Sequence, residues 1–149
     1  MHLRKLPFSS ADSFSGQSRH WNLYALAESD GSCSVEEFLH EQLQGGQISA
    51  AEQLLAFLDD MVFDEKGPQR WIGTPRCHES VAGKKIFEFK QGRLRVHWFY
   101  GQGQSIVILA RGALKQTNAT PKQLAKELIA LKYKYEEAAK SGHIKIVNE

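Results

Sequence analysis

Three short apolar segments joined by glycine-bearing connections constrain the fold of this chain most. They span residues 85–90, 93–100 and 105–111. The first connection is Gln91-Gly92, and the second spans residues 101–104. Because short connections that contain glycine favour antiparallel hairpins, we expect three consecutive strands.

The alternation of side chains in the first hairpin predicts which face is buried. With a two-residue loop at Gln91-Gly92, Glu88 lies opposite Arg95. The apolar side then carries Phe87, Phe89, Leu94, Val96 and Trp98. The opposite side carries Glu88, Lys90, Arg93, Arg95 and His97. A slip of one residue would bury charges, so the pattern favours this register and leaves a cationic face for solvent or for an anionic partner.

The rest of the chain predicts one earlier strand and three helices. Aromatic and alternating residues at 21–31 indicate a first strand. Ser and Glu at capping-box spacing open two short helices near residues 34 and 49. Residues 64–83 contain two Pro and three Gly without a consistent period, which indicates a long loop. A last helix is expected between Thr120-Pro121 and Gly142.

These elements predict an α+β fold in the order β-α-α-β-β-β-α. It has an antiparallel sheet of about four strands, an N-terminal αα-hairpin and a C-terminal helix. We expect one domain over residues 21–140, with a mobile N-terminal arm at 1–20 and a C-terminal tail at 141–149.

The composition indicates a cytoplasmic protein without a membrane span. No run approaches the roughly 18 apolar residues that a span requires, and the Ser-rich first twenty residues lack the apolar core of a secretory signal. Cys33 and Cys77 have no CxxC spacing and are expected to be free thiols.

The charge is divided unevenly along the chain. Residues 1–83 hold 6 Lys/Arg against 12 Asp/Glu, whereas residues 84–149 hold 13 against 5. This asymmetry indicates either a basic face for phosphate or two halves that neutralise each other in the fold. Arg95 with His97 indicate either a phosphate-binding surface or a solvated sheet face stabilised by the pair Glu88–Arg95. The polar stretch after the last strand, residues 115–117, is either part of the same surface or only a polar linker. The sequence shows no His/Cys/carboxylate cluster typical of a metal site, no P-loop and no nucleophile signature.

With these features assembled, the chain resembles RelE/HigB-type toxins of bacterial toxin–antitoxin modules, in their phage-derived subfamily. The resemblance covers about residues 21–138. It is carried by the loop "GPQRWIGTPRCHESVAGKK", the strands "IFEFK" and "LRVHWFY", and the exit "IVILARGALKQTNATP".

The resemblance implies a RelE-like fold and a ribosome-dependent mRNA endonuclease, an mRNA interferase that inhibits translation without metal or other cofactor. A ribose 2′-hydroxyl would attack the adjacent phosphate while cations stabilise the developing charge. Arg95 and Lys115 are then the principal catalytic phosphate ligands, and His97 is a candidate for proton transfer. The remaining expected RNA or phosphate contacts are Lys90, Arg93, Arg111, Gln116, Thr117 and Lys122. The implied partners are mRNA on the ribosome and a cognate antitoxin with a helix-turn-helix.

Three positions depart from the family pattern. The paired lysines are here Lys115-Gln116, the preceding aromatic is Ala113, and Arg111 replaces the usual His or Leu. These departures support an alternative, a non-catalytic RelE-fold protein that binds RNA or a partner without cleaving. A second alternative is a structural or phage-assembly module whose basic face binds an acidic protein. An enzyme acting on small molecules has least support, because no cofactor fingerprint is present.

Overall fold

The computed structural model describes residues 1–6, 19–115 and 119–147, and within these ranges seven strands form one mixed sheet. Its strand order is β3-β4-β5-β6-β2-β1-β7. The strands are β1 His2–Lys5, β2 Asn22–Ala27, β3 Cys77–Val81, β4 Ile86–Gln91, β5 Leu94–Tyr100, β6 Ile106–Leu114 and β7 Lys145–Val147. The helices are α2 Ser34–Gln44, α3 Ile48–Met61, the 3-10 helix η1 Gly67–Arg70 and α4 Lys122–Lys140. None of the helices in these ranges is both long and apolar enough to cross a membrane.

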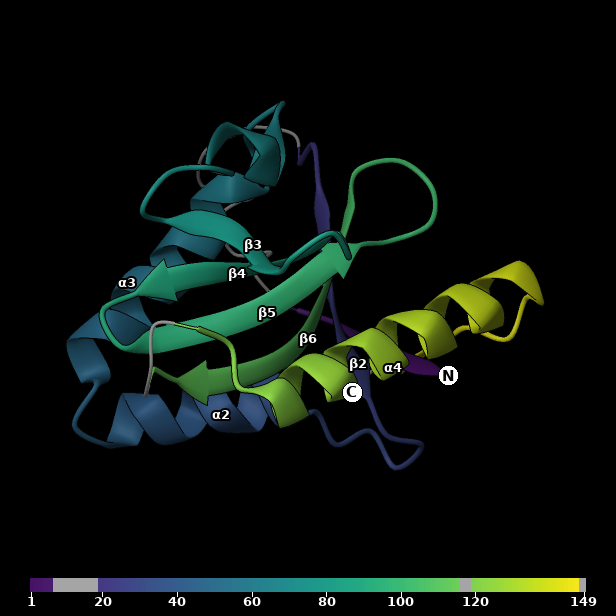
Figure 1. Ribbon diagram of the computed structural model, residues 1–149, viewed down its shortest axis with the longest axis horizontal. Coiled ribbons are helices and arrows are strands. Elements are labelled where there is room, and N and C mark those ends of the chain that lie inside the picture. Colours follow the sequence, from purple (N-terminus) through teal and green to yellow (C-terminus); the bar gives the residue numbers. More distant parts are fainter. Residues whose placement is uncertain (7–18, 116–118, 148–149) are drawn as a thin grey trace.

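Helices cover both faces of the sheet, so the protein has two apolar cores. Figure 1 shows α4 crossing the front of the sheet, with α2 and α3 behind it. The core on the α2–α3 side contains Phe89 and Trp98, and the core on the α4 side contains Phe99 and Leu128. The α4 face also carries the polar residues described below.

The predicted core face of the β4–β5 hairpin is confirmed. All five apolar residues that the alternation assigned to it are buried on the α2–α3 side. The Trp98 ring stacks on Phe87 and Phe89 at centroid distances of 4.8 and 4.9 Å, and Tyr100 meets it edge-on at 5.0 Å. Such aromatic contacts add to the area that these side chains bury.

The predicted register of this hairpin was wrong by two residues. Glu88 pairs with His97 instead of Arg95, and the two-residue loop is Gly92-Arg93. Gly92 has a φ of +57°, and a two-residue hairpin turn of type II′ requires glycine at its first loop position. The predicted loop placed Gly92 second. Because side chains alternate with a period of two, the shift leaves every side chain on its predicted face.

The predicted sheet was also wrong, although the α+β class is confirmed. Strands β1, β3 and β7 add to the four that were expected, and the sheet is mixed because β2 pairs in parallel with β6 and β1 with β7. β3 lies within the expected loop, where buried Cys77 and Val81 face opposite cores. β1 and β7 have 4 and 3 residues, too few to show an alternation in the sequence.

The three α-helices begin without the side-chain caps that the sequence predicted. No N-cap side chain bonds to the first turn of α2, α3 or α4. Thr120 instead donates its hydroxyl to the Ser80 carbonyl at 2.9 Å, which ties the segment before α4 to β3. The first amide groups of α4 therefore lie uncapped by a side chain next to the end of β6 (Figure 1).

Candidate functional site

A row of polar side chains crosses three neighbouring strands on the α4 face of the sheet. His78 of β3 pairs with Glu88 of β4, which in turn pairs with His97 of β5. Cross-strand partners have Cβ atoms about 4.5–5.5 Å apart, so this pairing brings the three polar groups into contact distance. Backbone register, rather than loop conformation, therefore positions the centre of the site.

Glu88 is the hub of this row. Its Oε1 lies 2.8 Å from His78 Nε2 and 3.7 Å from Arg95 Nε, and its Oε2 lies 3.8 Å from His97 Nδ1. The residue is only 8% exposed. A buried carboxylate is costly unless it is paired and hydrogen-bonded, and here groups from three directions compensate it.

Arg95 is buried rather than solvated, contrary to the open cationic face that the alternation suggested. The residue is 7% exposed, and its Nη1 donates to the carbonyls of Gly92 and Leu94 at 2.8 and 2.9 Å. Its Nη2 has no hydrogen-bond partner among the residues that the structure describes. The backbone thus accepts hydrogen bonds from Nη1, while Nη2 keeps its capacity to donate.

His97 is the most deeply buried of these groups, at 2% exposure. Its Nδ1 lies 3.0 Å from the Ser80 hydroxyl oxygen. Burial lowers the pKa of His97 below the usual value for histidine, and the nearby Glu88 carboxylate only partly opposes this shift. The ring is therefore neutral near pH 7 and is poorly accessible to a substrate.

A cavity of about 330 Å³ opens above this row, between the sheet and the start of α4. Its wall contains four of the predicted site residues: Lys90, Arg95, His97 and Lys115. The wall also contains His78, Glu88, Ala113, Leu114, Ala119, Thr120, Pro121 and Leu124. The N-terminal end of a 19-residue helix closes one side, and helix N-termini carry partial positive charge that favours anions. Three cationic side chains and a helix N-terminus make this a cavity suited to phosphate.

The other predicted contacts lie elsewhere. Arg93 is exposed in the hairpin turn, where its Nη2 donates to the Lys115 carbonyl at 3.4 Å. Lys122 is exposed on the first turn of α4 and is not part of the cavity wall. Gln116 and Thr117 lie outside the described residues.

Arg111 is separated from the cavity although it pairs with His97 in the β5–β6 register. Its Nε binds Glu127 Oε1 at 2.5 Å and its Nη1 donates to the Ser34 hydroxyl at 3.1 Å. Glu127 lies on α4 and Ser34 is the first residue of α2. Arg111 therefore links α4 to the start of α2, and it lines another cavity.

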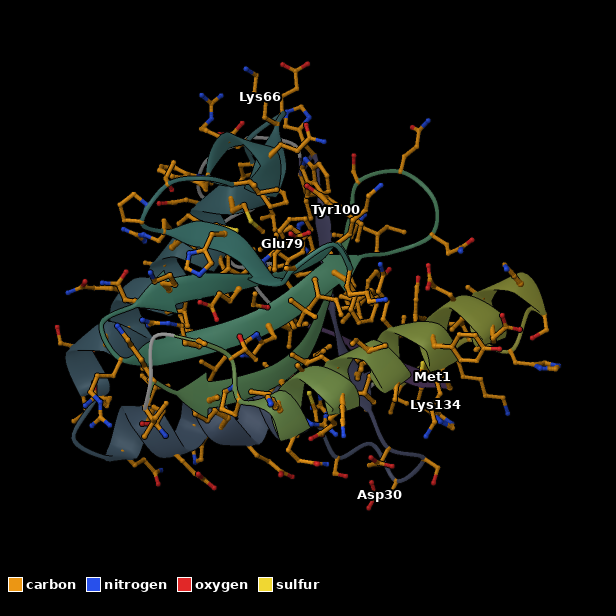
Figure 2. The ribbon with its side chains drawn as sticks, viewed as in Figure 1. Met1, Asp30, Lys66, Glu79, Tyr100 and Lys134 are labelled. Atoms are coloured by element: carbon orange, nitrogen blue, oxygen red, sulfur yellow. The ribbon has the colours of Figure 1, made fainter. Side chains whose placement is uncertain are left out.

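That second cavity, of about 900 Å³, lies at the C-terminal half of α4. Met1 and Lys134, both labelled in Figure 2, line its wall. Its charged wall residues have mixed signs: Glu28, Glu37, Arg111, Lys134, Glu137 and Lys140. Such a mixture shows no preference for an anion, so the smaller cavity is the better candidate site.

Sequence reasoning missed His78 and did not give Glu88 its central position. His78 was hidden because residues 64–83 were interpreted as a loop. The stretch Cys77–Val81 does not alternate: Cys77, Glu79 and Val81 would share one face of a regular strand, yet Glu79 is exposed between two buried residues, and the register shifts between Glu79 and Val81. The sequence of β3 therefore carries no periodic signal for a strand. Within the described residues no group of three or more His, Cys, Asp or Glu could hold a metal ion.

No family model matches the chain, and no curated protein is significantly similar to it. The cavity and the residues that carry the resemblance to RelE/HigB-type toxins are therefore the observations that bear on function.

Proposed function

We propose that this chain is the toxin of a type II toxin–antitoxin module, an mRNA endonuclease that acts on the ribosome. The observation that carries the proposal is the convergence of Lys90, Arg95 and Lys115 on one cavity with two histidines and a carboxylate. These residues come from three strands and a strand exit, and the sequence resemblance singled out the three cations independently of the structure.

The cavity offers the groups that RNA cleavage through the 2′-hydroxyl needs. The reaction builds negative charge on the phosphate oxygens, and preorganised cations stabilise such charge best where water is excluded. Arg95 contributes Nη2 from a guanidinium that is already held by two backbone carbonyls, so little reorganisation is required. Lys90 and Lys115 add point charges from the cavity wall, and α4 adds its N-terminal amides.

The partners in this proposal follow from the resemblance alone. A toxin of this kind is held inactive by a co-encoded antitoxin, here expected to contain a helix-turn-helix. Co-expression with the neighbouring reading frame should restore growth to cells that express the chain. Continued growth arrest with every adjacent reading frame would contradict this part of the proposal.

Primer extension on mRNA in a reconstituted translation reaction tests the nuclease. Wild-type protein should produce discrete breaks that require ribosomes. Lys90→Ala and Lys115→Ala should each reduce the cleavage rate by about 10- to 100-fold, because a hydrogen bond to a charged group contributes about 1.5–3 kcal/mol. Lys66→Ala is the matched control, because Lys66 is exposed and is not part of the cavity wall. Intact mRNA with folded wild-type protein and an active control toxin would refute the nuclease.

One observation favours a second candidate, a RelE-fold protein that binds RNA without cleaving it. Most of the Arg95 guanidinium is occupied by Glu88 and by backbone carbonyls. A protein that only binds RNA needs only Lys90 and Lys115, whereas a nuclease needs Arg95 Nη2 as well. RNA binding that depends on Lys90 and Lys115, with no new RNA ends, would establish this second candidate.

A further inference from the structure

An imidazole lies at the cavity with one ring nitrogen held by a buried carboxylate. His78 and Glu88 are cross-strand partners, and His78 Nε2 lies 2.8 Å from Glu88 Oε1. The His78 side chain is 42% exposed, whereas the Glu88 side chain is 10% exposed. The pair thus joins an accessible ring to a fixed anion.

The contact decides which nitrogen of the ring is basic. An ionised carboxylate only accepts hydrogen bonds, so the Nε2 of His78 must carry the proton that it donates to Glu88. The lone pair of the neutral ring is then on Nδ1. Nδ1 has no hydrogen-bond partner within the part of the chain that the structure describes. A histidine oriented in this way by a carboxylate is suited to accept a proton.

We propose that His78 accepts the proton of the attacking ribose 2′-hydroxyl and that Glu88 is the positioning residue that holds its ring; this inference rests on the proposed function. The 2′ oxygen forms a bond to phosphorus while its proton passes to His78 Nδ1. The bond between phosphorus and the 5′ oxygen breaks, and that oxygen takes a proton from solvent water. The products are a 2′,3′-cyclic phosphate and a 5′-hydroxyl, and His78 returns its proton to the hydroxide left in solvent.

His97, the candidate that the sequence suggested, is less suited to this step. Its exposure is 2%, and its Nδ1 is occupied by the Ser80 hydroxyl at 3.0 Å. A base must come within hydrogen-bond reach of the proton that it removes, and a substrate cannot reach a ring buried in this way. His97 instead supports Glu88 from the opposite side of His78.

The charged groups around His78 have two different roles in the proposed reaction. Those on the cavity wall are Glu88 and Lys90 from β4, Arg95 and His97 from β5, and Lys115 after β6. The three permanent cations suit the phosphate, and Glu88 lies within hydrogen-bonding distance of the His78 ring. The groups for proton transfer and the cations that stabilise charge therefore belong to the wall of the same cavity.

The alternative is that His78 and Glu88 form an ion pair that only stabilises an edge strand. Chemical rescue separates the two roles, because added imidazole replaces a missing proton acceptor but repairs no strand contact. The experiment measures single-turnover cleavage in preformed ribosome–mRNA complexes, with His78→Ala, Glu88→Gln and His40→Ala. His40 is exposed on α2 and serves as the matched control.

We expect His78→Ala to slow cleavage by about 10²- to 10⁴-fold, the usual contribution of general acid–base catalysis. Added imidazole should restore part of that rate, and His40→Ala should cleave like wild type. The ¹⁵N chemical shifts of His78 should show the Nε2–H tautomer in wild type and a mixture in Glu88→Gln. The tautomer measurement needs no RNA and no ribosome.

Each result decides between the claims. Wild-type protein that leaves mRNA intact overturns the proposed function and the cleavage step with it. Cleavage by wild type together with a rate within about threefold in His78→Ala, too small for general base catalysis, overturns only the role of His78. A folded His78→Ala variant that is slow but unaffected by imidazole overturns proton transfer in favour of the structural role. An Nδ1–H tautomer in wild type overturns the positioning by Glu88.

Discussion

Replacing Arg95 by methionine tests whether its guanidinium is part of the protein's interior. Methionine keeps most of the apolar part of the arginine side chain and removes the charged guanidinium group with its hydrogen-bond donors. The variant loses two hydrogen bonds to backbone carbonyls, at 2.8 and 2.9 Å, and leaves the Glu88 carboxylate without its permanent cation. The side chains of Arg95 and Glu88 are 9% and 10% exposed, so solvent replaces little of what is lost.

The magnitude follows from the burial of the pair. Removing one partner of a buried ion pair costs about 3–5 kcal/mol, because the other charge remains uncompensated. The two hydrogen bonds belong to the same guanidinium, so their loss is part of this figure rather than an addition to it. We therefore expect Arg95→Met to lower the free energy of unfolding by about 3–5 kcal/mol. The double variant with Glu88→Gln should recover about 1–3 kcal/mol of that loss, because no charge is then left buried alone.

Urea unfolding followed by tryptophan fluorescence measures both quantities. Arg95→Lys is the matched control, because it keeps the charge and should lose less stability than Arg95→Met. A cost below about 1 kcal/mol, typical of an exposed ion pair, would show that the guanidinium is not held as described. Additive effects of the two substitutions, within about 0.5 kcal/mol, would show that Glu88 and Arg95 do not interact.

Three further predictions test the packing, the buried imidazole and the rim of the cavity. A Cβ added to Gly112 would lie 2.2 Å from a Phe38 ring carbon, so Gly112→Ala should cost about 1–3 kcal/mol in urea unfolding, whereas Gly46→Ala, with no atom within 4 Å, should cost little. Burial lowers the pKa of His97 in the folded protein. As the pH falls below about 6.5, the unfolded chain therefore binds more protons at this residue than the folded protein does. Thermal melts should therefore show stability falling from about pH 7 to 5, and a smaller fall in His97→Asn. Lys115→Ala should lower the dependence of the logarithm of single-stranded RNA affinity on the logarithm of salt concentration by about 0.7 in slope, measured by fluorescence anisotropy. An unchanged slope would show that Lys115 does not contact phosphate.

The sequence predicted the elements whose residues alternate or repeat over enough length. Elements of this kind are the helices near residues 34, 49 and 122 and the strands β4, β5 and β6. The buried faces of β4 and β5 were predicted correctly although the register was wrong by two residues. It did not predict β1 and β7, because each is held by pairing with residues far away in the chain. The parallel contact between β2 and β6 likewise depends on the path of the chain through α2 and α3.

The site was predicted in part for the same reasons. Lys90, Arg95 and Lys115 meet in one cavity, which charge and resemblance indicated. The burial of Arg95 was not predictable, because alternation gives the face on which a side chain lies but not whether that face is covered in the fold. Arg111 was assigned to phosphate on charge alone, but Glu127 lies within bonding distance one element away. Contacts with residues distant in the chain, rather than residue type, decided which cationic side chains could contact phosphate in the cavity.

Glu88 is the residue that distinguishes the two functional interpretations. A surface that only binds phosphate gains nothing from a carboxylate among its cations, because the negative charge weakens the attraction for RNA. At this position the carboxylate instead compensates buried Arg95 and holds one nitrogen of an accessible imidazole. If its purpose were only to compensate Arg95, the contact with His78 at 2.8 Å would be incidental, and His78→Ala would leave both cleavage and RNA affinity unchanged. A Glu88→Gln variant that binds RNA more tightly but cleaves more slowly would show that the carboxylate opposes binding and serves the chemical step.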